Sequence, residues 1–195
     1  STRKSKGSTH LWKDGSVGQG RSKSIYIPPT KHDTAVLLAF FNPVPFKRPL
    51  KNVLYIMHCL KEAKIPYYVA ECVFFDRKPE IPGADLTVRS NSLMFYKEQL
   101  FNLLEPVVPV KYTKLVFLDC DILFSAPDWV DQVSSKLDEA DIVQPFSNAA
   151  WLYPDNTRVR VKKHSYGYAI AHKLMHKPPN AFHPGFAWAL KREIF

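Results

Sequence analysis

The chain has 195 residues, of which 46% are hydrophobic, and carries a formal net charge of +9. This length fits one α/β domain with a tail, and the hydrophobic fraction allows a sizeable core. No apolar stretch approaches the roughly 18 residues of a membrane span, so the sequence predicts no transmembrane segment. Cys59, Cys72 and Cys120 are odd in number and widely spaced, which argues against a disulfide framework and a zinc ribbon. Because the chain also has no Asn-x-Ser/Thr sequon, we expect reduced thiols and a cytoplasmic location.

Residues 1–34 differ in composition from the rest of the chain. They hold seven Lys/Arg side chains against Asp14 and Asp33, a net charge of +5, and they are rich in Ser, Gly and Thr. We expect a basic arm that is flexible or ordered by a partner, followed by a domain over residues 35–195. Basic arms bind nucleic acid, anionic membranes or acidic protein surfaces, and a solvating tail is the alternative interpretation.

From residue 35 onward, β-rich apolar runs alternate with helical stripes. The expected strands cover residues 35–41, 67–75, 114–119 and 141–146. The expected helices cover residues 49–63, 93–104, 127–137 and 165–176, and residues 76–90 are expected to be a polar connection. This alternation favours an α/β fold with a mostly parallel sheet flanked by helices.

The most informative segment is Leu118-Asp119-Cys120-Asp121-Ile122, at the end of an apolar run. In a strand, residues i and i+2 point to the same side, so Asp119 and Asp121 can act together while Cys120 faces the opposite way. Two carboxylates at the end of a buried strand either start a solvated loop or are neutralised by positive charge. A hard divalent ion that keeps waters and substrate phosphates in its shell is the natural candidate. The sequence therefore predicts a metal–diphosphate site at the carboxyl end of this strand.

Several sequence blocks, in this order, resemble the GT-A-fold glycosyltransferases. They are Ala39-Phe-Phe-Asn42-Pro43, Tyr96-Lys97-Glu98, the segment 117–124 around the acidic pair, and His183-Pro-Gly-Phe-Ala-Trp-Ala189. The resemblance spans residues 35–195 and implies a Rossmann-like GT-A domain. It also implies a nucleotide-sugar donor, a bound Mn²⁺ or Mg²⁺, and transfer of the sugar to an acceptor that the sequence does not identify.

The resemblance assigns donor-binding roles to four positions outside the acidic motif. Phe41 and Asn42 match the loop near the nucleotide base and ribose, although core packing explains the Phe equally well. Gly185 matches the segment that lines the donor-sugar pocket, where a Gly allows close approach of the backbone to a ligand. Lys97, on the helix before the acidic strand, either approaches a phosphate or lies on a solvated helix face.

The resemblance also assigns the two acids. Asp119 matches the first acid of the motif, which contacts the ribose or a metal-bound water, and Asp121 matches the last acid, the usual direct metal ligand. In the family, a Gly-rich acidic segment further along supplies the general base of inverting enzymes and part of the acceptor site. This sequence ends at Phe195 before that point. No catalytic base is therefore assigned, and the acceptor part is expected to be missing.

Three histidines are further candidates for a site. His172 and His176 are spaced i, i+4 on the last expected helix, a spacing that can place two imidazoles on one metal, although solvent-facing His is common near a helix C-terminus. His183 lies next to the Gly185 segment, with turn packing as its alternative role.

Two functions remain open at this point. The first is a metal-dependent glycosyltransferase. The second is a non-catalytic structural or binding protein on the same fold, anchored through residues 1–34 to nucleic acid or an acidic partner. The intact Asp119/Asp121 pair favours the enzyme, whereas the absent acceptor segment and the basic arm favour the binding protein.

Overall fold

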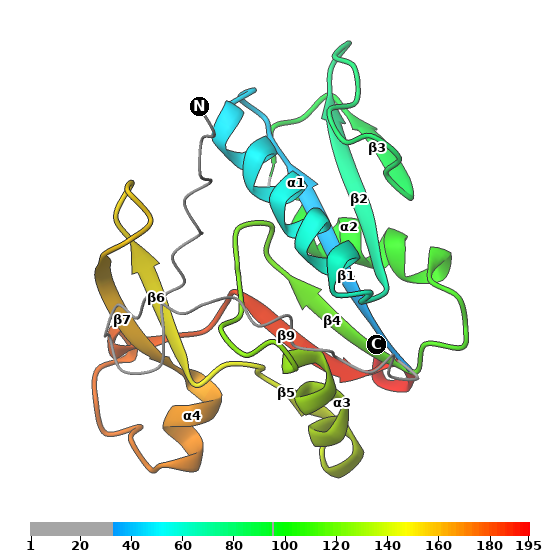
Figure 1. Ribbon diagram of the computed structural model, residues 1–195. Coiled ribbons are helices and arrows are strands. Elements are labelled where there is room, and N and C mark those ends of the chain that lie inside the picture. Colours follow the sequence, from blue (N-terminus) through cyan, green and yellow to red (C-terminus); the bar gives the residue numbers. More distant parts are fainter. Residues whose placement is uncertain (1–32, 95) are drawn as a thin grey trace, which may run out of the picture.

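The computed structural model describes residues 33–94 and 96–195 (Figure 1). Most of the expected arm, residues 1–34, therefore lies outside the described residues. Its last two residues belong to the folded domain, because Thr34 opens the first strand and is fully buried. The Asp33 carbonyl also accepts hydrogen bonds from the amides of Thr113 and Lys114.

A six-stranded sheet with the order β3-β2-β1-β4-β9-β5 forms the centre of the molecule (Figure 1). Its strands are β1 (Thr34–Phe41), β2 (Tyr67–Phe74), β3 (Leu86–Ser90), β4 (Lys114–Leu118), β5 (Ile142–Val143) and β9 (Ala187–Lys191). β1 is parallel to β2 and to β4, and β2 is parallel to β3. β9 runs antiparallel to both of its neighbours, β4 and β5. The expected α/β class is therefore confirmed, and the sheet is mixed because β9 runs antiparallel among otherwise parallel strands.

Helices cover both faces of this sheet. They are α1 (Lys47–Glu62) and α3 (Trp129–Glu139) on one face and α2 (Lys97–Leu104) on the other. The alternation along β1 produces the two layers, because Val36 and Leu38 pack beneath α1 and α3 whereas Ala35 and Leu37 pack against α2. Burying a side chain such as Leu38 completely contributes about 1.5–3 kcal/mol, so these two core layers dominate the stability of the domain.

A three-stranded sheet with the order β6-β7-β8 lies on the β9–β5 side of the main sheet (Figure 1). Its strands are β6 (Asn148–Leu152), β7 (Val159–Ser165) and β8 (Phe182–His183). Helix α4 (Tyr166–Ala171) and three 3-10 turns, η1 (Glu105–Val107), η2 (Pro179–Ala181) and η3 (Arg192–Ile194), complete the elements. No described helix is both long enough and apolar enough to traverse a bilayer.

Several sequence-based expectations for secondary structure were wrong, among them the strand expected over residues 141–146, which covers only Ile142–Val143. The connection over residues 76–90 contains the edge strand β3, whose half-buried residues alternate with exposed ones. The helix expected over residues 93–104 starts at Lys97, and the one expected over residues 165–176 ends at Ala171. His172 and His176 are therefore not on one helix. The ring of His172 packs on Tyr168 at 4.0 Å between centroids, and His176 lies in a later turn.

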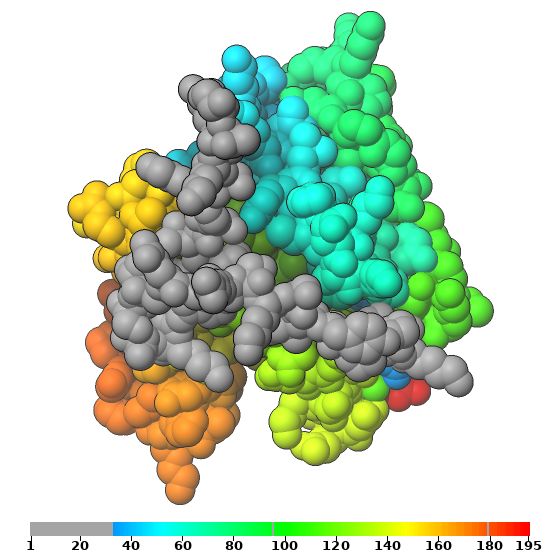
Figure 2. Space-filling model, in the orientation of Figure 1, coloured from blue at the N-terminus to red at the C-terminus, as the bar shows by residue number. Residues whose placement is uncertain are grey.

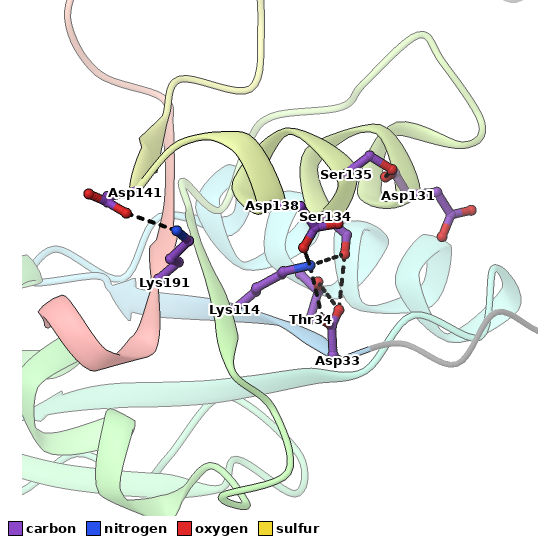
Figure 3. Close-up of polar contacts among 9 residues, drawn as sticks. All are labelled: Asp33, Thr34, Lys114, Asp131, Ser134, Ser135, Asp138, Asp141 and Lys191. Atoms are coloured by element: carbon purple, nitrogen blue, oxygen red, sulfur yellow. Dashed lines mark hydrogen bonds and ion pairs between the residues drawn. The ribbon is translucent and has the colours of Figure 1, made fainter.

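A buried lysine ties the amino ends of β1 and β4 to α3 (Figure 3). Lys114 Nζ lies 3.0 Å from Asp33 Oδ2, 2.6 Å from Asp138 Oδ1 and 3.0 Å from Ser134 Oγ. Burial alone would raise the pKa of Asp33, but hydrogen bonds from Lys114 and Ser134 outweigh it and hold that pKa below its ordinary value. The network closes the amino edge of the sheet, and the carboxyl edge is where the candidate site lies.

Candidate functional site

The candidate site lies where the order of the parallel strands reverses. From β1 the chain proceeds to β2 and β3 on one side of the sheet, whereas β4 pairs with β1 on the other side. Open α/β sheets bind ligands in the crevice outside the carboxyl ends of the strands at such a point. The residues that follow β1 and β4 here are Asn42 and Asp119.

The acidic motif forms a turn rather than the end of a strand. β4 ends at Leu118, and the Ile122 amide donates to the Asp119 carbonyl at 3.4 Å. Cys120 Sγ donates to the Ala39 carbonyl at 3.3 Å, so its thiol points toward β1, where it packs against the α1 side of the core. Burial, followed by the charges of Asp119 and Asp121, raises the pKa of Cys120 to about 12. Cys120 is therefore a neutral thiol that fastens the turn to β1.

Charged side chains of both signs surround this turn. Lys97, at the first position of α2, forms an ion pair with Asp119, and each of the two side chains is 27% exposed. The pKa of Asp121 is raised, first by burial of its carboxyl group and then by the negative charge of Asp119. This holds although Asp121 as a whole residue keeps much of its surface in contact with solvent. The charges of Lys97 and Arg48 lower the Asp121 pKa and offset part of the rise.

The donor set of this turn fits a hard divalent cation. Within residues 33–94 and 96–195 there is no cluster of three or more His, Cys, Asp or Glu side chains that could hold a metal. Asp119 and Asp121 therefore offer only carboxylate oxygens, and waters and substrate oxygens would complete the shell, as is usual for Mg²⁺. The pKa of Asp121 is raised first by burial and then by the negative charge of Asp119, and a cation between the two carboxylates would offset that repulsion.

The Gly185 segment is joined to this turn through its backbone. The Asp119 amide donates to the Phe186 carbonyl at 2.9 Å, and the Gly185 amide donates to His183 Nδ1 at 3.2 Å. A Cβ on Gly185 would stand 3.3 Å from His183 Cε1. The close approach that the glycine allows is thus to the His183 imidazole of the same segment.

Phe41, expected near the nucleotide base, is half-buried at the end of β1. Its ring meets that of Phe74 at 5.0 Å between centroids and that of Tyr96 at 6.5 Å. Because Tyr96 precedes Lys97, these contacts place Phe41 beside the start of α2. Its role toward a nucleotide stays a prediction, and its packing role is visible.

Asn42 is 3% exposed and shapes the loop between β1 and α1. Its Nδ2 donates to the Phe46 carbonyl at 3.2 Å and to Glu80 Oε2 at 3.1 Å, and its Oδ1 accepts from the Phe46 amide at 3.3 Å. Both amide hydrogens are thereby used within the protein. A contribution of Asn42 to nucleotide binding would act through the shape of this loop.

The structure links Phe41, Lys97, the acidic pair and the Gly185 segment, whereas the side chain of Asn42 bonds to Phe46 and Glu80. Lys97 contacts Asp119, and Asp119 contacts the residue after Gly185. Phe41 contacts the residue before Lys97, and the charge of Asp119 acts on Asp121.

Sequence reasoning missed two residues of this region. The positive charge of Arg48, in the first turn of α1, lowers the pKa of Asp121. The sequence could have indicated this, because the loops after β1 and β4 lie at the same edge of the sheet. Gln144 follows β5, and its Nε2 donates to the carbonyls of His183 and Pro184 at 3.2 and 3.0 Å. Its Oε1 accepts from the Gly167 amide at 2.9 Å. No local sequence pattern indicates so long-range a tie.

Comparisons with known proteins add no assignment to this geometry. No family model matches the chain, and no curated protein matches it either.

Proposed function

We propose that this protein is a metal-dependent glycosyltransferase that takes a sugar from a nucleotide-sugar donor. One observation carries the proposal: Asp119 and Asp121 lie together after β4, beside the end of β1, at the reversal of strand order. The sequence resemblance to GT-A-fold glycosyltransferases supports it further.

Each charged residue of the turn has a role in this proposal. Asp121 and Asp119 would hold Mn²⁺ or Mg²⁺, which when bound neutralises the charge of the leaving diphosphate. Lys97 and Arg48 add positive charge at the same edge and orient the diphosphate oxygens. The neutral Cys120 keeps the turn against β1, and the Phe186 carbonyl fixes its first residue.

The reaction is a displacement at the anomeric carbon of the donor sugar. The bond from that carbon to the diphosphate oxygen breaks, and a bond to the acceptor hydroxyl oxygen forms. The nucleoside diphosphate leaves with the bonding electron pair, and the acceptor proton passes to a base, to which we assign no residue. The charged residues around the acidic turn would act on the leaving diphosphate, which belongs to the donor. Donor binding can therefore be tested separately from sugar transfer.

Thermal melts of the full chain test donor binding directly. Mn²⁺ together with UDP or GDP should raise the melting temperature, because a ligand at 100 times its dissociation constant stabilises the native state by about 2.7 kcal/mol. Asp121→Asn, which keeps the size of the side chain, should lose this shift.

The matched control is Asp76→Asn, an exposed carboxylate after β2 at the same edge of the sheet. It should keep the wild-type shift. Equal shifts in the wild type and in Asp121→Asn would exclude the acidic turn as the binding site. Absence of any shift with both nucleotides would count against donor binding altogether, and release of free sugar from UDP- or GDP-sugars then tests catalysis separately.

A further inference from the structure

A pocket opens on the small sheet. It measures about 250 Å³ and is lined by Trp151 of β6 and by Arg160, Val161 and Lys163 of β7. In the space-filling view, the part of the hairpin around β6 (yellow) projects at one edge of the face shown (Figure 2). The pocket is open and its exposed lining is mainly apolar, and two of the four residues that line it, Arg160 and Lys163, are cationic.

A β-bulge places Arg160 among the residues that line this pocket. Adjacent residues of a regular strand point to opposite faces, yet Arg160 and Val161 both line the pocket. Trp151 pairs with Val161 and Leu152 pairs with Val159, so Arg160 is the extra residue of a register shift. Bulges redirect a side chain in this way and are frequent next to active sites. Lys162, the next alternating position, faces away with its partner Ala150.

The described residues provide no carboxylate partner for the two cationic residues of the pocket, Arg160 and Lys163. Lys163 Nζ donates one hydrogen bond, to the Asn180 carbonyl at 2.7 Å, which fixes the ammonium and leaves two of its N–H groups. The ammonium group of Lys163 and the guanidinium group of Arg160, which both belong to residues that line the pocket, are groups that suit an anion.

The pocket adjoins the acidic turn through a short chain of contacts. The Trp151 ring lies 5.0 Å from the rings of both His183 and Phe186, measured between centroids. Phe186 in turn accepts the hydrogen bond of the Asp119 amide. Trp151 and Phe186 thus link the pocket to the proposed donor site.

We propose that this pocket binds an acidic saccharide, which the glycosyltransferase proposed above uses as its acceptor, so that acceptor binding would lie on the small sheet and not only in the segment that the family resemblance puts beyond Phe195. The face of a Trp ring stacks on the C–H face of a sugar, while Arg160 and Lys163 pair with a carboxylate, sulfate or phosphate on the same sugar. The volume suits one charged sugar residue. Single-stranded nucleic acid needs a track of stacking platforms along a groove, and this pocket offers one aromatic side chain.

The test is to titrate the full chain with four probes at low salt and to monitor binding by NMR or calorimetry. The probes are a uronate-containing disaccharide, a sulfated disaccharide, the neutral disaccharide of the same linkage, and an oligothymidylate. At least one acidic disaccharide should bind ten times more tightly than the neutral one. Arg160→Glu should weaken that binding at least tenfold.

Lys162→Glu is the matched control, because it makes the same kind of charge change on the same strand but on the opposite face. It should bind the acidic disaccharide within twofold of the wild type. Equal loss of affinity in the two variants, or equal affinity for the acidic and the neutral disaccharide, would contradict the proposed saccharide site. Tighter binding of oligothymidylate that Arg160→Glu abolishes would assign the pocket to nucleic acid instead.

The same titrations separate this inference from the proposed function. Mn²⁺ with UDP or GDP should stabilise Arg160→Glu as much as the wild type, because Arg160 lies outside the acidic turn. Binding of the acidic disaccharide without any effect of Mn²⁺ and nucleotide would preserve the saccharide site and reject its role as the acceptor site of a transferase.

Discussion

The Asp119 amide donates its hydrogen bond to a carbonyl, that of Phe186, whose residue has a left-handed backbone with φ of 78°. This bond continues the β4–β9 pairing one step beyond Leu118 and Ala187. The ring of Phe186 packs against the rings of Trp151 and His183. Phe186 therefore couples the backbone of the acidic turn to the pocket on the small sheet.

Replacing Phe186 tests whether its backbone is strained. Both Phe186→Ala and Phe186→Gly remove the ring contacts, so both should be less stable than the wild type. In an ordinary strand Gly destabilises the protein more than Ala does. At a positive φ the order is reversed, because the Cβ of Ala clashes with the backbone. We expect Phe186→Gly to exceed Phe186→Ala in free energy of unfolding by about 1 kcal/mol. Urea unfolding of the two variants measures this, and an advantage of Ala would show that the φ of 78° is not kept in solution.

Lys97→Met separates two roles of the lysine. The lysine neutralises Asp119 in the structure, so its removal should strengthen binding of Mn²⁺ alone several-fold. Binding of Mn²⁺ with UDP should weaken instead, because a phosphate contact is lost. Lys61→Met, in the last turn of α1, is the control and should change neither affinity. If both affinities rise in Lys97→Met, the lysine does not contact the diphosphate.

The central strands could be predicted from the sequence because their apolar runs have no competing interpretation. The expected strand over residues 35–41 and the observed β1 differ by one residue, and the expected strand over residues 67–75 is β2 with one residue fewer. The short edge strand β3 and the polar strand β7, which is central in the small sheet, were missed because neither has such a run. The antiparallel direction of β9 is set by long-range pairing with β4 and β5, which no local pattern encodes.

Part of the candidate site could also be predicted from the sequence. Two acids after a buried strand marked the acidic segment, but they lie in a turn after β4, so the alternation of strand side chains does not determine the direction of Cys120, whose thiol bonds to the Ala39 carbonyl. Arg160 could not be found this way, because its orientation depends on a bulge defined by the register of two strands. Asn42 was assigned to a ligand, whereas its burial and its bonds to Phe46 and Glu80 are features of packing.

Glu71 is expected to organise the loop that holds Asn42. It is 1% exposed in the middle of β2, and its two carboxyl oxygens accept from the amides of Glu80 and Ile81 at 2.6 and 3.1 Å. Glu71→Gln turns one acceptor into a donor that faces an N–H group, which should cost about 1–3 kcal/mol.

Amide hydrogen exchange provides the local measurement for this variant. The amides of Glu80 and Ile81 should lose protection in Glu71→Gln while those of β4 keep theirs. Glu62→Gln, at the exposed end of α1, is the control and should stay within about 0.5 kcal/mol of the wild type. Unchanged protection at Glu80 and Ile81 in Glu71→Gln would contradict the role of the carboxyl group.

The pH dependence of stability should report the Lys114 network at the amino edge of the sheet. The Lys114 side chain is 9% exposed, and its partners Asp33 and Asp138 are 43% and 69% exposed. Lys114→Met keeps the apolar stem and removes the charge. Because both carboxylates stay partly in water, we expect a loss of only about 1–2 kcal/mol at pH 7. Lys136→Met, in a pair with Glu139 whose side chains are 66% and 71% exposed, should lose less than about 0.5 kcal/mol.

The sign of the pH effect follows from the two pKa shifts of this network. The pKa of Asp33 is held below its ordinary 3.8, so its stabilisation is present above that pH and disappears as the pH falls through the folded-state pKa. Burial alone would lower the pKa of Lys114, but its bonds to Asp138 and Asp33 raise it above 10.5, so its stabilisation persists up to that pH and fades above it. The difference in unfolding free energy between wild type and Lys114→Met should therefore be constant from about pH 5 to pH 9 and shrink below pH 4. Urea unfolding across this range measures it, and a difference that grows on acidification would mean that Asp33 is not charged against Lys114 in the native protein.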